Sequence, residues 1–248
     1  MTDALVMSGR SLRHLTRSLD ALLLSVILPV TILLMFVYVF GGAITTGTAY
    51  INYVVPGILL LCGGYGAAQT SLGVANDMQT GVIDRFRSMP INGASVLTGH
   101  VVAGVVRNFL PTALVAGLAV LMGFRPAGGL AQWAGAVGVL MLYMTAIAWL
   151  SVCFGLIAKS TEGAGAFPFF ILFLPYVSSA FVPTSTMPSG LQWFAEHQPV
   201  TPIIETVRGL LMGTPLGNSA WLAVAWSLGI LLVGYALART LFRRGASR

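Results

Sequence analysis

Long apolar runs alternate with short polar segments along this chain, and this alternation predicts its organisation. The apolar runs cover residues 21–41, 53–75, 96–122, 130–157, 163–182 and 220–241. A helix needs about 20 apolar residues to cross the hydrocarbon core of a bilayer, and each run reaches that length. The pattern therefore predicts an all-α polytopic membrane protein with six transmembrane helices.

A short charged island, residues 76–93, separates the second run from the third. Its apolar positions recur at helical steps of four, four and three residues: Met78, Val82, Phe86 and Met89. The polar and charged positions between them include Asp77, Gln79, Asp84, Arg85 and Arg87. Pro90 ends the pattern because proline lacks the N–H that would continue the helix. The spacing predicts a short amphipathic helix over residues 76–90 that contacts a partner; the alternative is a helix lying on the lipid headgroups.

The residues before the first run also have two faces. Leucines at positions 5, 12, 15 and 19 share one helical face, whereas Arg10, Arg13 and Arg17 occupy the other. This distribution is typical of a helix that lies flat in the membrane interface, with its arginines toward anionic headgroups. We therefore expect an interfacial helix over residues 3–19.

The longest segment outside the runs, residues 183–219, contains five prolines and yet remains apolar. Trp193 belongs to one apolar patch, and Thr201 can cap a second short helix. Glu205 and Arg208 are three residues apart on that helix and can pair. A loop this apolar is expected to return into the membrane, packed against protein, as a helical hairpin over residues 187–213.

The distribution of basic residues predicts the orientation. Ten lie in segments on the side that holds both termini: Arg10, Arg13, Arg17, Arg85, Arg87, Lys159, Arg239, Arg243, Arg244 and Arg248. Only Arg125 and Arg208 lie in the segments on the other side. Because positive residues collect in cytoplasmic loops, we expect both termini in the cytoplasm.

Composition excludes a soluble protein. The chain of 248 residues is 56% hydrophobic and 8% charged, and its mean hydropathy is +0.87. The net charge of +6 follows from the basic cytoplasmic segments and needs no nucleic-acid partner. Cys62 and Cys153 both lie inside apolar runs, so we expect neither a disulfide nor a metal site. No cleavable signal peptide is expected, since the first run is a full span.

Catalytic chemistry is not indicated by any motif. The sequence around Lys159, AKST, lacks the glycine that precedes the lysine of a phosphate-binding loop, so we expect no ATP hydrolysis by this chain alone. All seven acidic residues lie outside the centres of the runs, which argues against a proton-driven carrier. Arg107 and Asn108 lie within the third run. Arg107 either faces a pathway or a partner acid, or it snorkels or pairs with backbone carbonyls near the end of a long helix. Phe170 and Tyr176 of the fifth run suit hydrophobic cargo and ordinary lipid contact equally.

Two stretches carry a family resemblance. The island NDMQTGVIDRFRSMPING followed by GHVVAGVVRNFLPTALVAGLAVLMGFRP, and the later FAEHQPVTPIIETVRGLLMG, resemble the permeases of type-2 ATP-binding-cassette exporters. The likeness is greatest to the daunorubicin-resistance membrane-subunit branch. Together with the six runs, it extends over nearly the whole chain.

The resemblance implies a single transmembrane permease domain, residues 1–248, in a bacterial cell membrane. It implies pairing with a second permease copy, identical or paralogous, and with a separate cytoplasmic ATPase that binds ATP and Mg, whereas this chain holds no cofactor. The island would be the coupling helix that docks on the ATPase, and Trp193, Glu205 and Arg208 would belong to an external gate. Cargo would be amphiphilic drugs, lipids or glycolipids.

Two other classes remain open from the residues alone. A membrane-embedded enzyme acting on lipid-linked substrates would need a polar cluster in one leaflet, and only His100, Arg107 and Asn108 come close. A non-catalytic scaffold or channel is the other. A neighbouring reading frame with the phosphate-loop motif GxxxxGK[ST] would favour the exporter.

Overall fold

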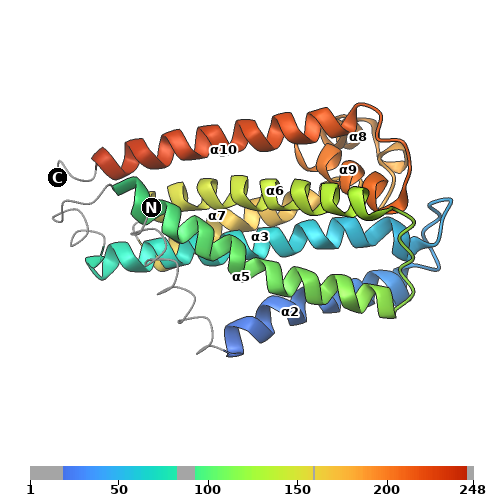
Figure 1. Cartoon of the computed structure of the whole chain (residues 1–248), viewed down its shortest axis with the longest axis horizontal. Coiled ribbons are helices and arrows are strands. Elements are labelled where there is room, and N and C mark those ends of the chain that lie inside the picture. The colour runs from blue at the N-terminus through green and yellow to red at the C-terminus, as the bar shows by residue number, and fades with distance from the viewer. Residues whose placement is uncertain (1–18, 83–92, 159, 245–248) are drawn as a thin grey trace.

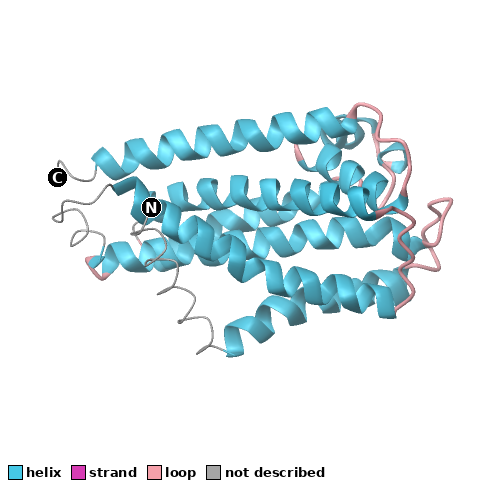
Figure 2. Ribbon diagram, in the orientation of Figure 1, coloured by secondary structure: helices cyan, strands magenta, loops and turns pink. Residues whose placement is uncertain are grey.

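The computed structural model describes residues 19–82, 93–158 and 160–244, and these residues form helices joined by short loops, with no strand among them (Figure 2). The long helices are α2 (Leu19–Leu34, continued by a π-helix at Met35–Phe40), α3 (Tyr50–Gln79), α5 (Gly93–Leu121), α6 (Leu130–Ile157) and α10 (Ser219–Arg244). The shorter ones are α7 (Thr161–Phe173), α8 (Ser189–His197) and α9 (Val200–Met212). The predicted all-helical class is confirmed.

Helices α3, α5, α6 and α10 are long and apolar enough to cross a membrane. The first and fifth predicted runs form shorter apolar helices, at Val26–Phe40 and Gly163–Val177. Apolar side chains on the outward faces of the bundle, such as Leu110, Leu114 and Leu232, are more than half exposed, as lipid-facing positions are expected to be. The chain is therefore a helical membrane protein, and four of its six predicted spans have the required length.

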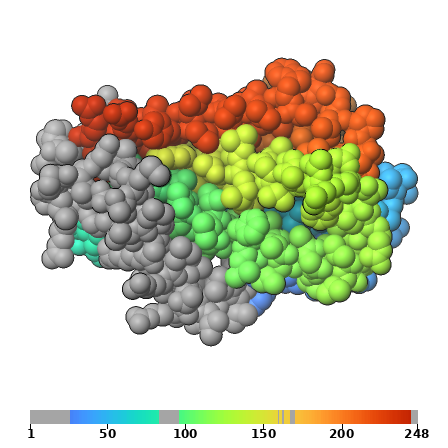
Figure 3. All heavy atoms as spheres, viewed as in Figure 1, coloured from blue at the N-terminus to red at the C-terminus, as the bar shows by residue number. Residues whose placement is uncertain are grey.

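Helix α3 is the central element of the bundle. It contacts α2, α5, α6, α7 and α9, and Val54, Ile58 and Leu61 on it are fully buried. Helix α10 packs on α6 at the periphery, and Figure 3 shows α10, α6 and α5 side by side on one face. The long helices run along the long axis of the molecule (Figure 1), so each end of the bundle collects the ends of several helices.

Small residues on α3 allow close contacts with neighbouring helices. A Cβ atom added to Gly66 would lie 2.5 Å from Cγ of Asn108 on α5. One added to Gly64 would lie 2.7 Å from a methyl group of Leu172 on α7. Association of helices within lipid depends on such packing, because hydrophobic burial contributes little there. The glycines of the second run thus permit the close approach of α5 and α7 to α3.

The two ends of the bundle carry different elements. At one end lie the end of α3, the start of α5 and the end of α10; we call it the Asp77 end (Figure 1). At the other end lie α8, α9 and the loops after α2 and α5; we call it the Arg208 end. The described start of the charged island, residues 76–82, and the apolar hairpin therefore lie at opposite ends of the bundle.

The structure corrects the start of the predicted helix over residues 76–90. Asn76–Gln79 is the last turn of α3, and Gly81, with φ of +69°, ends it in the left-handed conformation that glycine adopts at low cost. The Gly81 N–H donates to the carbonyl of Met78 at 3.3 Å, as in a common helix C-cap. Met78 and Val82 therefore do not lie on one continuous helix.

Several predicted features lie outside the described residues. They are the interfacial helix before residue 19, with Arg10, Arg13 and Arg17, and the remainder of the island, with Asp84, Arg85, Phe86, Arg87 and Met89. Their predicted roles stay predictions.

The fifth run also ends earlier than predicted. Helix α7 stops at Phe173, a 3-10 turn covers Leu174–Val177, and irregular backbone follows where the prediction continued a span to residue 182. Pro175 lacks the N–H that would continue an α-helix, which explains the break.

Candidate functional site

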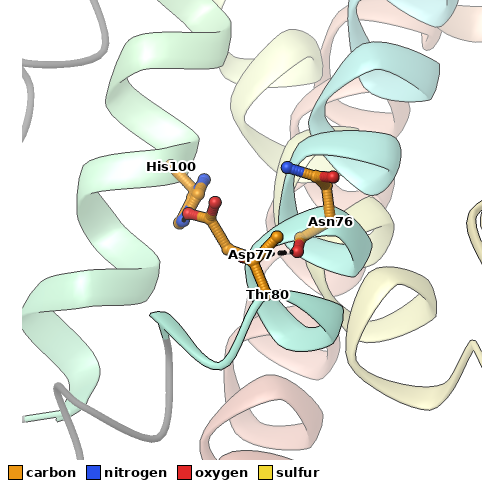
Figure 4. A network of polar contacts seen from close by, with 4 residues as sticks. All are labelled: Asn76, Asp77, Thr80 and His100. Atoms are coloured by element: carbon orange, nitrogen blue, oxygen red, sulfur yellow. Dashed lines mark hydrogen bonds and ion pairs between the residues drawn. The ribbon is translucent and has the colours of Figure 1, made fainter.

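The Asp77 end holds an ion pair between two helices. Asp77 lies on the last turn of α3 and His100 near the start of α5, and His100 Nε2 lies 3.2 Å from Asp77 Oδ2 (Figure 4). Both side chains are partly exposed, at 31% for Asp77 and 19% for His100. The contact is an ion pair when the imidazole is protonated and a hydrogen bond otherwise. It joins the two helices that flank residues 83–92.

Neighbouring groups fix the end of α3 beside this pair. The Thr80 hydroxyl and the Thr80 N–H both donate to the carbonyl of Asn76 at 2.9 Å (Figure 4). Met78 is half-buried and packs against the apolar cluster that includes Val74 and Leu97, whereas Gln79 is exposed. Of the island residues that the structure describes, Asp77 and Met78 thus contact the bundle itself, and Gln79 faces outward.

The Arg208 end holds a part-buried guanidinium. Arg208 Nε donates to the carbonyl of Tyr53 at 3.1 Å, and a terminal nitrogen donates to the carbonyl of Ser179. The guanidinium also lies 3.8 Å from the centre of the Tyr53 ring, a cation–π contact. Burial lowers the pKa of Arg208, yet an arginine titrates so far above neutral pH that it remains a cation. One side chain therefore connects α9, α3 and the turn after α7.

The predicted pairing of Glu205 with Arg208 is not what the structure has. Glu205 Oε2 accepts a hydrogen bond from the Ser219 hydroxyl at 2.9 Å, and Arg208 is directed to backbone carbonyls instead. One of these carbonyls, that of Ser179, belongs to the irregular backbone after α7, where carbonyls without helical partners need donors. Trp193 on α8 is 63% exposed and stacks on the ring of His197. The three predicted gate residues therefore do not form one cluster.

Gln198 is a residue that the sequence analysis did not single out. It is buried between α8 and α9, and its Nε2 donates to the carbonyls of Leu174 at 3.2 Å and Val177 at 3.0 Å. The Tyr50 hydroxyl donates to the carbonyl of Phe181 at 2.9 Å. These donors satisfy the carbonyls that the break after α7 leaves without helical partners. The prolines of the fifth run were the available signal, because a break at membrane depth requires such donors.

The middle of the bundle contains the other predicted polar residues. Asn108 is 5% exposed and lies against Gly66 of α3. Arg107 is partly buried, and its Nε is buried with no hydrogen-bond partner among the described residues. Phe170 is 67% exposed, and Tyr176 stacks on Phe181 with ring centres 5.2 Å apart. These residues come from different faces of the bundle and do not converge.

A catalytic cluster of His100, Arg107 and Asn108 is not formed. His100 and Arg107 are seven residues apart on α5, which places them about 10 Å apart along the axis. His100 is bound to Asp77, and Asn108 is packed on α3. Within the described part of the chain, no three His, Cys, Asp or Glu side chains are grouped so that they could hold a metal ion.

Together these features define a helical membrane protein with a polar side-chain contact between helices at each end of its bundle. Residues 2–212 match the family of ABC-2 type transporters, and the chain belongs to this family.

Similarity to individual proteins extends along nearly the whole chain. A daunorubicin resistance ABC transporter permease protein of Streptomyces coeruleorubidus is 29% identical over 242 residues, covering 94% of this chain and 86% of that protein. A probable doxorubicin resistance ABC transporter permease protein of Mycobacterium tuberculosis is 24% identical over 249 residues, covering 97% and 90%. The chain is thus a permease of the ABC transporter family, similar to permeases implicated in drug resistance.

Proposed function

We propose that this chain is the membrane-spanning subunit of an ATP-driven exporter that moves amphiphilic drugs, lipids or glycolipids out of the cell. A separate cytoplasmic subunit would bind ATP and Mg and hydrolyse the nucleotide. Two permease copies, identical or paralogous, would form the translocation unit in a bacterial cell membrane. The family membership and the names of the two relatives support this proposal.

The proposed topology has six membrane helices, with the Asp77 end and both termini in the cytoplasm. Four helices have the length for a span, and α2 with its π-helix and α7 with its 3-10 turn would be the other two. Arg239 and Arg243 near the end of α10 lie at the Asp77 end, as the preference of basic residues for the cytoplasmic side requires. Helices α8 and α9 would then form the outer hairpin.

The Asp77–His100 contact is the observation that carries the proposed mechanism. It joins α3 and α5 on either side of residues 83–92, the segment that would dock on the ATPase with Phe86 and Met89 as apolar contacts and Asp84, Arg85 and Arg87 as charged ones. A displacement of the docked segment would thus be transmitted to α3 and α5 at the same time. ATP binding shifts the equilibrium between inward and outward states only if the docked complex favours one of them.

The Arg208 end would have two parts, a fixed one around the break after α7 and an exposed one on α8. Arg208 and Gln198 hold the break after α7 against α3 and α9. Trp193 of α8 is exposed and would contact the outer leaflet, where tryptophan is enriched. The exit would open by movement around this braced hairpin.

Phe86→Ala tests the coupling step. The permease and its ATPase subunit are reconstituted in liposomes, and efflux of a fluorescent amphiphile and ATP hydrolysis are measured together. If Phe86 is a central anchor, its truncation costs roughly 2 kcal/mol of docking free energy, and transport falls at least about tenfold. Phe109→Ala, at a half-exposed position on α5, is the matched control and keeps wild-type transport.

Two results would contradict the proposal. Wild-type efflux by a Phe86→Ala permease that is present at the normal level would remove the docking role. Efflux by the permease alone, without any ATPase subunit, would remove ATP as its driving force.

A further inference from the structure

Arg107 lies near the centre of a membrane span. The apolar part of α5 covers Val96–Leu121, and Arg107 follows Val96 by eleven residues, about 16 Å along the axis. Half of the hydrocarbon core is about 15 Å thick, and an arginine side chain reaches roughly 7 Å from its Cα. The guanidinium therefore cannot reach either headgroup layer by extending along the helix.

Among the described residues, no acidic side chain pairs with Arg107. Its Nε is buried without a hydrogen-bond partner among the described residues. The seven acidic residues are Asp3, Asp20, Asp77, Asp84, Glu162, Glu196 and Glu205, and all lie outside the centres of the apolar runs. A second identical copy would carry the same acids at the same depths. The negative charge that balances Arg107 must then come from another molecule, since an isolated charge at this depth is costly.

The position of Arg107 on α5 makes it accessible to a molecule in the membrane. It lies at the border between the packed face, which includes Asn108, and the outward face, where Val106 and Leu110 are 44% and 53% exposed. An amphiphile could place its head at the guanidinium and its chain along these apolar side chains. Arginine suits such a head because its fork of N–H donors matches a carboxylate or a phosphate bidentately.

We propose that Arg107 binds the anionic head, carboxylate or phosphate, of an amphiphilic molecule within the membrane, and that this molecule is cargo of the exporter. Only the identification of the bound molecule as cargo rests on the proposed function. The anion site itself can be tested on the permease without its ATPase.

Binding is measured on the purified full chain in phosphatidylcholine bilayers. The probes are spin-labelled stearate, which carries a carboxylate, and its uncharged methyl ester, and electron paramagnetic resonance gives the association of each with the protein. We expect the preference for stearate over the ester to fall about tenfold in Arg107→Gln, which corresponds to about 1.4 kcal/mol. Arg107→Lys retains part of the preference, and Arg125→Gln, which removes an exposed arginine outside the span, retains all of it.

Unlabelled phosphatidylglycerol distinguishes the two sources of an anionic head. If it displaces stearate, the site accepts a bilayer lipid; if it does not, the site selects a single-chain amphiphile, and either result supports an anion site. An equal preference for stearate in the wild type and in Arg107→Gln would overturn it.

The role in transport is tested on the assembled complex. Arg107→Gln is expected to slow efflux of the carboxylate probe more than that of the ester. Equal slowing of both, together with lost stearate binding, would overturn the cargo assignment and leave a lipid that stabilises the bundle. A complex that transports neither probe in its wild-type form would overturn the cargo assignment while leaving the binding result intact; the proposed function is tested separately by the ATP-dependent efflux of the fluorescent amphiphile.

Discussion

The two ends of the bundle hold their helices together by different chemistry. At the Asp77 end, one contact between partly exposed side chains joins α3 to α5. At the Arg208 end, part-buried or buried side chains of Arg208, Gln198 and Tyr50 donate to backbone carbonyls of the segment after α7. Water can hydrogen-bond to Asp77 and His100 when their contact breaks. Where water is excluded, the carbonyls at the Arg208 end have no other donor if these side chains are lost.

This difference predicts which end moves at low cost. An exposed ion pair contributes about 0–1 kcal/mol, because water and salt compete with it. A buried carbonyl left without a donor costs about 1–3 kcal/mol. A bundle built in this way is expected to rearrange first at the Asp77 end and to keep the Arg208 end as a fixed frame. Substitutions at the two ends test this comparison.

The largest effect is expected for Arg208→Met. The change leaves the carbonyls of Tyr53 and Ser179 without their donor and removes the contact with the Tyr53 ring, so the free energy of unfolding should fall by about 3 kcal/mol. Denaturant or thermal unfolding of the purified permease measures the loss. Arg125→Met is the matched control, since its guanidinium bonds to carbonyls at an exposed position. Equal unfolding midpoints for the two variants would show that this end is not braced.

A smaller loss is expected for Gln198→Leu. The leucine has nearly the same volume but no donor, so the carbonyls of Leu174 and Val177 lose their partner and the bundle loses about 2 kcal/mol. The same unfolding assay applies. Gln192→Leu on α8 removes a side chain whose amide bonds to Glu196 at an exposed position and should change little. A Gln198 variant as stable as that control would contradict the capping role.

The smallest effect on stability is expected for Asp77→Asn. It should change the free energy of unfolding by less than about 1 kcal/mol, because the pair is partly exposed. Its effect should instead appear in the efflux per ATP hydrolysed by the assembled complex.

His100→Gln should give the same loss of coupling as Asp77→Asn, and the double variant should be no worse than either. Two independent, additive losses would show that the residues do not act through their contact. Glu196→Gln, an exposed acid at the other end, is the control for lost charge.

Much of the fold was readable from the apolar runs because each run contains an apolar helix. Helix α6 has the predicted bounds, Leu130–Ile157, since Gly129 precedes it and extended backbone at Ala158 follows it. The fifth span was predicted to continue to residue 182 because the run remains apolar past Pro175, and hydropathy does not register a missing N–H. The turn at Gly81 was missed because Met78 and Val82, on either side of it, are four residues apart, which is also the spacing expected in one continuous helix.

The candidate site was less accessible from the sequence. Asp77 was identified as a charged residue of the island, but its partner lies 23 positions further on, and a one-dimensional pattern does not show which residue faces it across two helices. Gln198 and Tyr50 act through backbone carbonyls, which leave no trace in side-chain patterns. Arg107 was visible because a lone charge within an apolar run is conspicuous.

Gly81 sets the direction in which the chain leaves α3 by backbone torsion alone. No heavy atom of the described residues lies within 4 Å of where its Cβ would be, so an alanine there would meet none of them and would be strained through its positive φ. The bend leading out of the helix can therefore be loosened with a single methyl group while every surrounding contact is left as it was.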